Sequence, residues 1–133
     1  MKRSLLQGRY WNHVSSIKTL LHTLDADIIC FQETKLTRIS ADLDICQVDG
    51  YEAYFSFSKT RQGYSGVATY VRKEAALPLA AEEGFSGILN EGQSTLGGYD
   101  LLFQEYSKQE LNELDSEGRC IITDHGGFIL FNV

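Results

Sequence analysis

Apolar positions in the first third of the chain change their spacing at about residue 25. In residues 13–24 they recur every three or four positions, which predicts an amphipathic helix with its apolar face inward. Residues 28–32 form a short continuous apolar run with β-branched and aromatic side chains, a pattern typical of a strand buried on both faces. A helix followed by such a strand favours an α/β fold built in layers.

The middle of the chain predicts two more strands and a loop. Residues 51–58 and 66–72 have strand composition, and a polar connection that contains glycine separates them. Residues 84–98 contain five glycines and little apolar periodicity, so we expect a loop there.

The last third predicts a helix and a hairpin. Ser107 and Glu110 have the Ser-x-x-Glu spacing of a capping box, which opens a short helix over residues 107–114. Residues 119–123 and 128–133 follow as two strands joined by a tight turn that contains glycine. The acids of this region are expected on the solvated face of the short helix: Glu105, Glu110, Glu113, Asp115 and Glu117.

The composition is that of one folded unit. The 133 residues are 43% apolar and 11% aromatic, which is enough for a packed core. The net charge of −6 has the wrong sign for binding nucleic acid through bulk charge. It is unevenly spread, because residues 1–73 carry +3 and residues 74–133 carry −9. A phosphate-binding face is therefore expected in the first half.

The cysteines and the lack of a long apolar run indicate the cellular compartment of the protein. Cys30, Cys46 and Cys120 stand at no metal-ligand spacing, which indicates structural thiols in a reducing compartment. No stretch approaches the roughly 20 apolar residues of a membrane span. We expect a soluble intracellular protein with no membrane partner.

The sharpest local pattern follows the run at residues 28–32. A buried strand there would deliver Glu33, and then Lys35, to its carboxyl end, where open α/β sheets place their ligand sites. With period two, Glu33 is expected on the face of Ile29 and Phe31. A carboxylate in this position suits a Mg²⁺ ion that also takes phosphate oxygens. An ordinary surface ion pair between Glu33 and Lys35 explains the same pattern, and the residues alone leave both interpretations open.

Five segments, in chain order, carry a family resemblance: residues 24–38, 54–58, 63–69, 81–84 and 114–119. The first of them is Leu-Asp-Ala-Asp-Ile-Ile-Cys-Phe-Gln-Glu-Thr-Lys-Leu-Thr-Arg. It resembles the first signature of the exonuclease III-type apurinic/apyrimidinic endonucleases, in the endonuclease/exonuclease/phosphatase superfamily. The other four resemble later segments of the same family, so the resemblance covers most of the chain.

The resemblance implies a four-layered α/β sandwich of two facing sheets flanked by helices, with this chain as about the first half of the domain. It also implies a Mg²⁺-dependent DNA repair nuclease, with Mn²⁺ as an alternative ion, that hydrolyses the phosphodiester 5′ to abasic sites and has 3′–5′ exonuclease action. DNA with abasic sites or 3′ ends would be the partner. The implied location is the nucleus, with mitochondria as a second one, and a sliding clamp would be reached only through family segments outside this chain.

The resemblance also implies roles for particular residues. Glu33 matches the metal-binding Glu of the family, and Lys35 matches the Lys that supports it. Gly63 and Tyr64 fall where the family loop touches the DNA backbone beside the lesion, and Arg61 is near enough to add charge. An ordinary connection between two strands is the structural alternative for residues 63–66.

Other family signatures have no match. The family's first strand ends in Trp-Asn followed by Gly and Arg, whereas Trp11 and Asn12 lack those followers. Trp11 is expected to pack at the start of the helix. The later Tyr, Gly-Asp-x-Asn and Ser-Asp-His segments would come after Val133. Residues 123–125 imitate the last of them, but the glycines that follow indicate a turn. We therefore expect a partial domain over residues 1–133, truncated at both ends, with an incomplete catalytic set and little or no activity alone.

Two further functions stay open, and so does the question whether the isolated chain is an enzyme. One is a non-catalytic short isoform that binds DNA or a protein partner, since half of a two-sheet sandwich would expose an apolar face. The other keeps the superfamily and changes the substrate, to that of a retroelement-type endonuclease or of a phosphatase for small phosphoesters.

Overall fold

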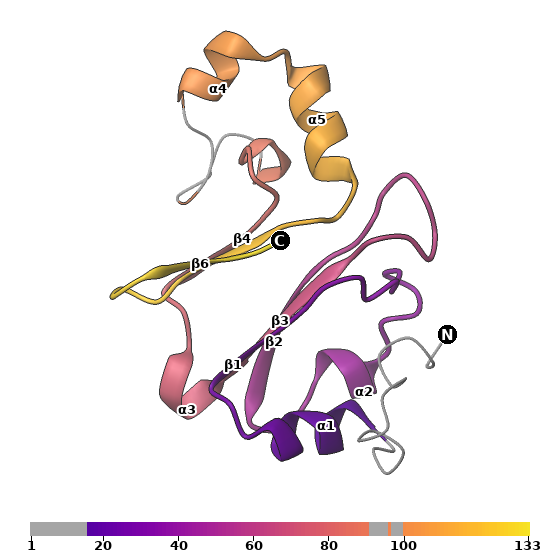
Figure 1. Ribbon diagram of the computed structural model, residues 1–133, viewed down its shortest axis with the longest axis vertical. Helices are drawn as coiled ribbons and strands as arrows, with labels where there is room; N and C mark the ends of the chain where they lie inside the picture. The colour runs from indigo at the N-terminus through magenta and orange to yellow at the C-terminus, as the bar shows by residue number, and fades with distance from the viewer. Residues whose placement is uncertain (1–15, 91–95, 97–99) are drawn as a thin grey trace.

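The elements of the fold are seen in a computed structural model that describes residues 16–90, 96 and 100–133 (Figure 1). In chain order they are α1 (Ile17–Leu24), β1 (Ile28–Phe31), α2 (Leu43–Cys46), β2 (Tyr51–Ser56), β3 (Val67–Arg72), α3 (Lys73–Ala76), β4 (Ala80–Glu83), the 3-10 turn η1 (Ile88–Asn90), α4 (Asp100–Glu105), α5 (Lys108–Ser116), β5 (Ile121–Asp124) and β6 (Ile129–Asn132). The predictions for Trp11 and Asn12 concern residues outside the described ones.

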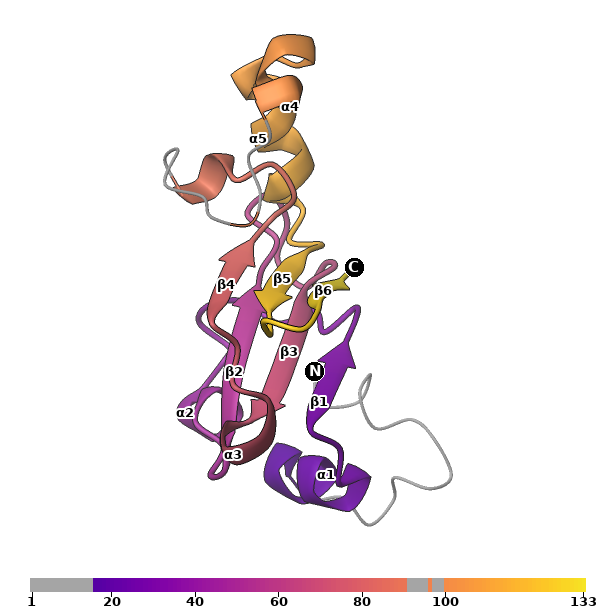
Figure 2. The same ribbon diagram turned by 90° about the vertical axis from the view of Figure 1, so that its left-hand side faces the viewer.

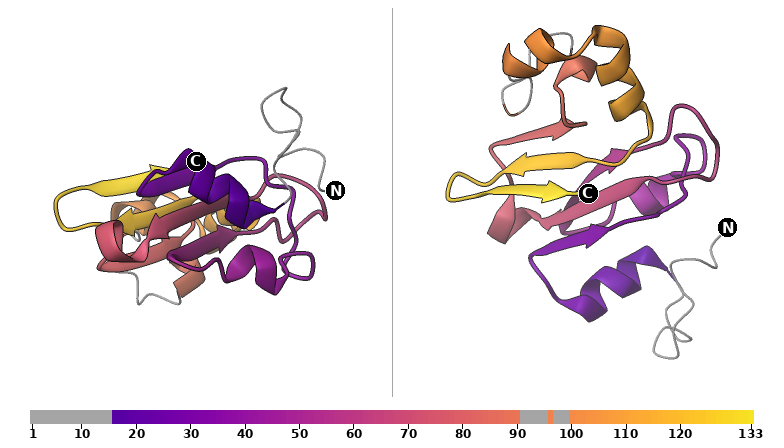
Figure 3. Two further views of the ribbon diagram at one scale, coloured as in Figure 1. Left: turned by 90° about the horizontal axis from the view of Figure 1, so that it is seen from below. Right: turned by 45° about the horizontal axis from the view of Figure 1, so that its top comes forward.

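The described strands form two antiparallel sheets that face each other. One has the order β1-β3-β2 and the other the order β4-β5-β6. Strands β2 and β3 contact strands of the second sheet, and Figure 2 shows the second sheet lying over the first. Helices α4 and α5 lie at one end of the molecule and α1 at the other (Figure 3). The predicted α/β sandwich is confirmed.

The main core lies between helix α1 and the first sheet. Leu21 of α1 packs against Ile29, Ala68 and Tyr70, which are all buried. Strand β3 occupies the centre of this sheet and is buried on both faces, whereas β1 pairs only with β3 among the described strands. The predicted burial of residues 28–32 on both faces is therefore wrong, because the central position belongs to β3.

A buried amide ties the two sheets together. The Asn132 side chain in β6 donates to the Ala68 carbonyl at 3.0 Å and to the Thr69 hydroxyl at 3.0 Å. It also accepts a 2.6 Å hydrogen bond from Gln32, the residue after β1. Since a buried polar group without a partner is costly, these bonds fix how the sheets sit at the carboxyl end of β1.

Helix ends follow their capping residues. The Ser16 side chain accepts a hydrogen bond from the Thr19 amide, so α1 begins at Ile17. The predicted start near residue 13 lies outside the described residues. The capping box of Ser107 and Glu110 is present, but α5 runs on to Ser116 rather than ending at residue 114. The strand β4 and the short helices α2, α3 and α4 were not predicted.

The hairpin of β5 and β6 uses the residues that imitate a catalytic segment. Asp124 accepts a hydrogen bond from the Gly126 amide. The two ring nitrogens of His125 bond to the Ala76 carbonyl and the Thr123 hydroxyl, each at 2.9 Å. These contacts stabilise the turn, in line with its glycine-rich sequence. Among the described residues, no helix has the length and apolar character that crossing a membrane requires.

Candidate functional site

The segment after β1 leaves the strand in an unusual backbone conformation. Glu33 and Lys35 have φ of 51° and 55°, in the left-handed region that few side chains favour. The amide of Thr34 donates to the Gly66 carbonyl at 2.9 Å, and that of Lys35 donates to the Ser65 carbonyl at 2.8 Å. These bonds hold the segment against the residues that lead into β3. The strand ends before Glu33, so the period-two expectation for its face does not hold.

Gly66 makes this close approach possible. Its φ is 87°, and a Cβ at this position would lie 2.6 Å from the Thr34 hydroxyl oxygen. A larger residue would have to displace either Thr34 or the backbone that leads into β3, because both the space and the backbone conformation require glycine. The position of Glu33 therefore depends on a glycine more than 30 residues away in the sequence.

Two cations contact the Glu33 carboxylate, which is about half exposed. Lys35 Nζ lies 3.5 Å from Oε2, and Arg119 Nη1 lies 3.4 Å from Oε1. The ion pair with Lys35 that the sequence left open is thus present. Pairs this long and this exposed contribute little to stability, so the carboxylate remains accessible to a small ion.

Glu33 fits one part of a magnesium site. Within residues 16–90, 96 and 100–133, no group of three or more His, Cys, Asp and Glu side chains is arranged to hold a metal. Mg²⁺ needs only one or two carboxylates when waters and phosphate oxygens complete its shell. The half-exposed Glu33 suits that role as a single ligand.

Arg119, just before β5, joins Glu33 to the predicted DNA-contacting loop. Its Nε donates to Glu117 at 2.5 Å, its Nη2 to the Tyr64 hydroxyl at 2.7 Å, and its Nη1 to Glu33 at 3.4 Å. The hydrogen bonds to Glu117 and then to Tyr64 raise the pKa of the guanidinium above its ordinary value. We call Glu33, Tyr64, Glu117 and Arg119 the Arg119 cluster.

Tyr64 is held between two guanidinium groups. Arg61 lies 4.9 Å and Arg119 5.2 Å from the centre of its ring, within the range of cation–π attraction. The preceding Gly63 has φ of 66°, which allows the connection between β2 and β3 to turn there. Through Tyr64 and Arg119, the predicted DNA-contacting residues adjoin the predicted metal ligand.

Sequence reasoning missed the contacts of Arg119 and Glu117. It expected Glu117 on a solvated helix face, and this is wrong, because Glu117 is half buried against Arg119. The sequence signal that could have indicated these contacts is Gly118, which stands between the oppositely charged Glu117 and Arg119. A Cβ on Gly118 would come within 2.3 Å of the Phe57 backbone, so Gly118 lets this segment pass close to the end of β2.

Asp115 is also not on a solvated face. Its side chain is 2% exposed and accepts hydrogen bonds from the Phe85 amide at 2.8 Å, the Ser86 amide at 3.2 Å and the Ser86 hydroxyl at 2.5 Å. It thereby fixes helix α5 to the turn after β4. This anchor sets the position of the residues that follow, Glu117 and Arg119.

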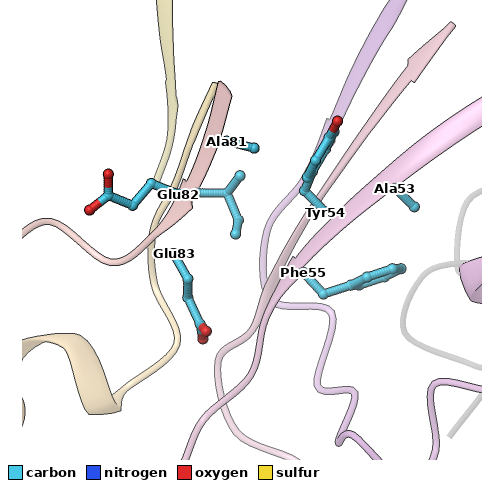
Figure 4. A pocket seen from close by; sticks show the side chains of 7 residues that line it. Ala53, Tyr54, Phe55, Ala81, Glu82 and Glu83 are labelled. Atoms are coloured by element: carbon cyan, nitrogen blue, oxygen red, sulfur yellow. The ribbon is translucent and has the colours of Figure 1, made fainter. Parts of the chain in front are cut away.

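A second concave feature lies between the edge strands β2 and β4. It is a cavity of about 250 Å³, and Figure 4 shows Tyr54 and Phe55 on one side of it and Glu82 and Glu83 on the other. Burial raises the pKa of Tyr54. Glu83 accepts a 2.9 Å hydrogen bond from Ser56 across the sheets, so this region serves sheet packing.

The cysteines match their predicted structural role. All three are free, and Cys120 is buried. Burial, helped by the nearby Asp115, raises the pKa of Cys120 to about 12, and burial likewise raises the pKa of Cys30 and Cys46. Since the thiolate is the reactive form, these thiols are poor nucleophiles and poor ligands at neutral pH.

Comparison with known proteins identifies relatives. Residues 6–98 match the model of the Endonuclease/Exonuclease/phosphatase family. The chain is 47% identical over 127 residues to mouse DNA-(apurinic or apyrimidinic site) endonuclease 2 and 40% identical over 134 residues to that of Schizosaccharomyces pombe, with 92% of this chain covered in each case. These alignments cover 24% and 25% of the two relatives, so the chain spans about a quarter of their length.

Two solved structures have the same fold. The crystal structure of the Xenopus laevis APE2 catalytic domain superposes with a TM-score of 0.70 at 46% identity, covering 81% of this chain and 33% of that one. The AP endonuclease LMAP from Leishmania major gives 0.57 at 26% identity, covering 87% of this chain and 33% of that one. The resemblance stated from the sequence is confirmed.

Proposed function

The chain belongs to the endonuclease/exonuclease/phosphatase family, and from that membership we propose that it is part of a DNA repair nuclease for abasic sites, carrying a metal ligand and a DNA-backbone contact. The observation that supports this most directly is the Arg119 cluster. One guanidinium contacts both Glu33, the predicted metal ligand, and Tyr64, the predicted DNA contact. A phosphodiester bound at Tyr64 would thus adjoin an ion at Glu33.

The roles follow from charge and position. Mg²⁺ at Glu33, with Mn²⁺ as the alternative, would supply Lewis-acid stabilisation of the charged phosphate. Lys35 and Arg119 each contact one oxygen of the Glu33 carboxylate. Arg61 presents a guanidinium that can donate to phosphate oxygens, and Tyr64 presents a ring to the sugar. Three cations in one place give this acidic chain a local surface for a polyanion.

The reaction proposed for the complete domain is hydrolysis 5′ to the abasic site, with 3′–5′ exonuclease action as a second activity. Phosphoryl transfer also needs a positioned water and stabilisation of the leaving oxygen. The family segments to which the resemblance assigns these two roles have no match in residues 1–133. We therefore propose that residues 1–133 form a partial domain that binds DNA in the nucleus but turns over little or no substrate alone.

The test combines binding and incision on a duplex with a tetrahydrofuran abasic analogue in Mg²⁺ buffer. We expect salt-dependent binding without detectable incision. Arg61→Gln should weaken binding and lower the salt slope by about one, as expected for the loss of one phosphate contact, whereas Lys108→Gln, an exposed cation on helix α5, should change neither. Incision that Glu33→Ala abolishes would contradict the expected inactivity, and equal effects of the two variants would contradict the DNA-contact role.

A second candidate function is a binding module, and one observation favours it. Strand β6 and its turn expose large apolar side chains, each about half accessible: Phe128, Ile129, Phe131 and Val133. Such patches either bind a partner or cause association. Sedimentation and thermal melting of the chain test this, since a monomer that melts cooperatively supports a stand-alone module and reversible or irreversible association speaks against one.

A further inference from the structure

The three hydrogen bonds of Arg119 are unequal. Glu117 accepts at 2.5 Å and the Tyr64 hydroxyl at 2.7 Å, whereas Glu33 lies at 3.4 Å. The first two are within the range of strong charge-assisted bonds, and the third is at its limit. Arg119 is therefore held mainly by Glu117 and Tyr64, and its hold on Glu33 is loose.

The backbone that carries Glu117 is firmly fixed. Two residues before it, Asp115 accepts three hydrogen bonds in a buried position. One residue after it, Gly118 packs so closely on the Phe57 backbone that a Cβ would not fit. Glu117 thus presents its carboxylate to Arg119 from a rigid support, and it does so at a shorter distance than Glu33.

Arg119 and a divalent cation would compete for Glu33. Arg119 contacts Oε1 and Lys35 contacts Oε2, so an inner-shell ion on either oxygen must displace a cation or lie beside it at a repulsive distance. The weaker the bond between Arg119 and Glu33, the smaller this cost. The partner that draws Arg119 away from Glu33 should therefore govern how well Glu33 binds a metal.

We propose that Glu117 is a positioning residue that keeps Glu33 open to a divalent cation by holding Arg119 against Tyr64. This inference rests on the proposed function, since it takes Glu33 as a metal ligand. Glu117 itself does not bind the ion. Its effect passes through Arg119, and the same contact links the occupancy of Glu33 to the anchoring of Tyr64.

The proposal makes an asymmetric prediction about two substitutions. In Glu117→Gln, Arg119 loses its strongest partner and closes on Glu33, so the affinity for Mn²⁺ should fall about fivefold, an effect of the size that exposed charge pairs show. In Arg119→Gln the competing cation is gone, and the affinity should rise by about the same factor.

The double variant separates this mechanism from a simple field effect. Loss of the Glu117 charge would lower metal affinity through space even if Arg119 played no part. In that case Glu117→Gln would weaken binding equally in the wild-type chain and in the Arg119→Gln chain. If Glu117 acts through Arg119, Glu117→Gln should change the Mn²⁺ affinity of the Arg119→Gln chain less than twofold, because the residue through which Glu117 acts is absent there.

The measurement is an Mn²⁺ titration of the whole chain without DNA, followed by paramagnetic broadening of the backbone amide signals of Glu33 and Thr34. Lys108→Gln is the control, because it also removes one positive charge but from an exposed position on helix α5. It should change the affinity less than twofold. Glu117→Asp keeps the charge on a shorter side chain, so its Mn²⁺ affinity should lie between those of the wild type and Glu117→Gln. A native-like amide spectrum of this variant shows that substitution at position 117 leaves the chain folded.

The outcomes separate the inference from the function on which it rests. Broadening that is centred elsewhere, or that Glu33→Ala leaves unchanged, overturns the metal role of Glu33 and the inference with it. Broadening at Glu33 with equal effects of Glu117→Gln in both backgrounds overturns the inference alone. A loss of affinity seen only when Arg119 is present supports both.

Discussion

Two carboxylates show how differently one chain can use the same chemical group. Asp115 is 2% exposed, lies in the last turn of helix α5 and accepts three hydrogen bonds, the shortest of 2.5 Å. Glu33 has a side chain that is 52% exposed and contacts two cations at 3.4 and 3.5 Å. The first is committed to holding α5 and β4 together. The second keeps its oxygens within reach of a further ligand, at little gain in stability.

The largest expected effect comes from removing the buried carboxylate of Asp115. Asp115→Ala leaves the Phe85 amide and the Ser86 donors without their acceptor, so the free energy of unfolding should fall by about 3 kcal/mol. Urea unfolding followed by circular dichroism measures this. The control is Glu113→Ala on the exposed face of the same helix, for which about 0.5 kcal/mol is expected. Equal effects would mean that the hydrogen bonds of Asp115 contribute nothing in solution.

Gly66→Ala should have the next largest effect and tests the support of the exposed carboxylate. The new methyl group would clash with Thr34 in a backbone conformation that disfavours it, at a cost of about 1–3 kcal/mol. The matched control is Gly127→Ala, where a Cβ meets nothing within 4 Å. Urea unfolding and the amide shifts of Glu33 and Lys35 report the result, and unchanged shifts in the first variant would contradict the described packing.

A smaller effect is expected from pH at a third carboxylate, Glu110 in the capping box. Hydrogen bonds from the Ser107 amide and hydroxyl lower its pKa below the ordinary value of 4.5. A lowered folded-state pKa means that this stabilisation is present above about pH 4.5 and is lost as the pH falls through the folded value. The stability difference between wild type and Glu110→Gln should therefore shrink below pH 4.5. A difference that stays constant from pH 7 to pH 3 would exclude the ionised capping box.

The smallest effect is expected for Glu33 itself. Glu33→Gln removes two long, exposed ion pairs, so the free energy of unfolding should change by no more than about 0.5 kcal/mol. The same urea experiment as for Asp115 applies. A loss of more than about 1.5 kcal/mol would show that Glu33 is a structural residue like Asp115 and would remove the basis of the comparison.

Local patterns predicted the local parts of this fold. The strands β2 and β3, the hairpin of β5 and β6 and the capping box of α5 lie within one or two residues of their predicted places. Strand β4 was missed because Ala80, Ala81, Glu82 and Glu83 have neither β-branched nor aromatic side chains. Its extended form comes from pairing with β5, which no window around it reveals.

The candidate site also combines residues that local motifs predicted with contacts that they did not predict. Glu33, Lys35 and Tyr64 were singled out from short motifs, and their metal and DNA roles remain predictions. The burial of Asp115 depends on partners 29 and 30 residues away. The contacts of Arg119 span 55 residues to Tyr64 and 86 to Glu33. Such contacts are set by how the sheets pack, so they cannot be read from spacing.

The link between Arg119 and Glu33 also has a consequence for the order of folding. Glu33 follows strand β1 of the first sheet and Arg119 leads into strand β5 of the second. Their contact therefore closes a large loop, and contacts of long sequence separation form slowly. A folding intermediate with a native first sheet would already hold Tyr64 and Glu33 near each other and still lack the guanidinium between them. Formation of the Tyr64–Arg119 hydrogen bond should therefore report the moment at which the two sheets dock.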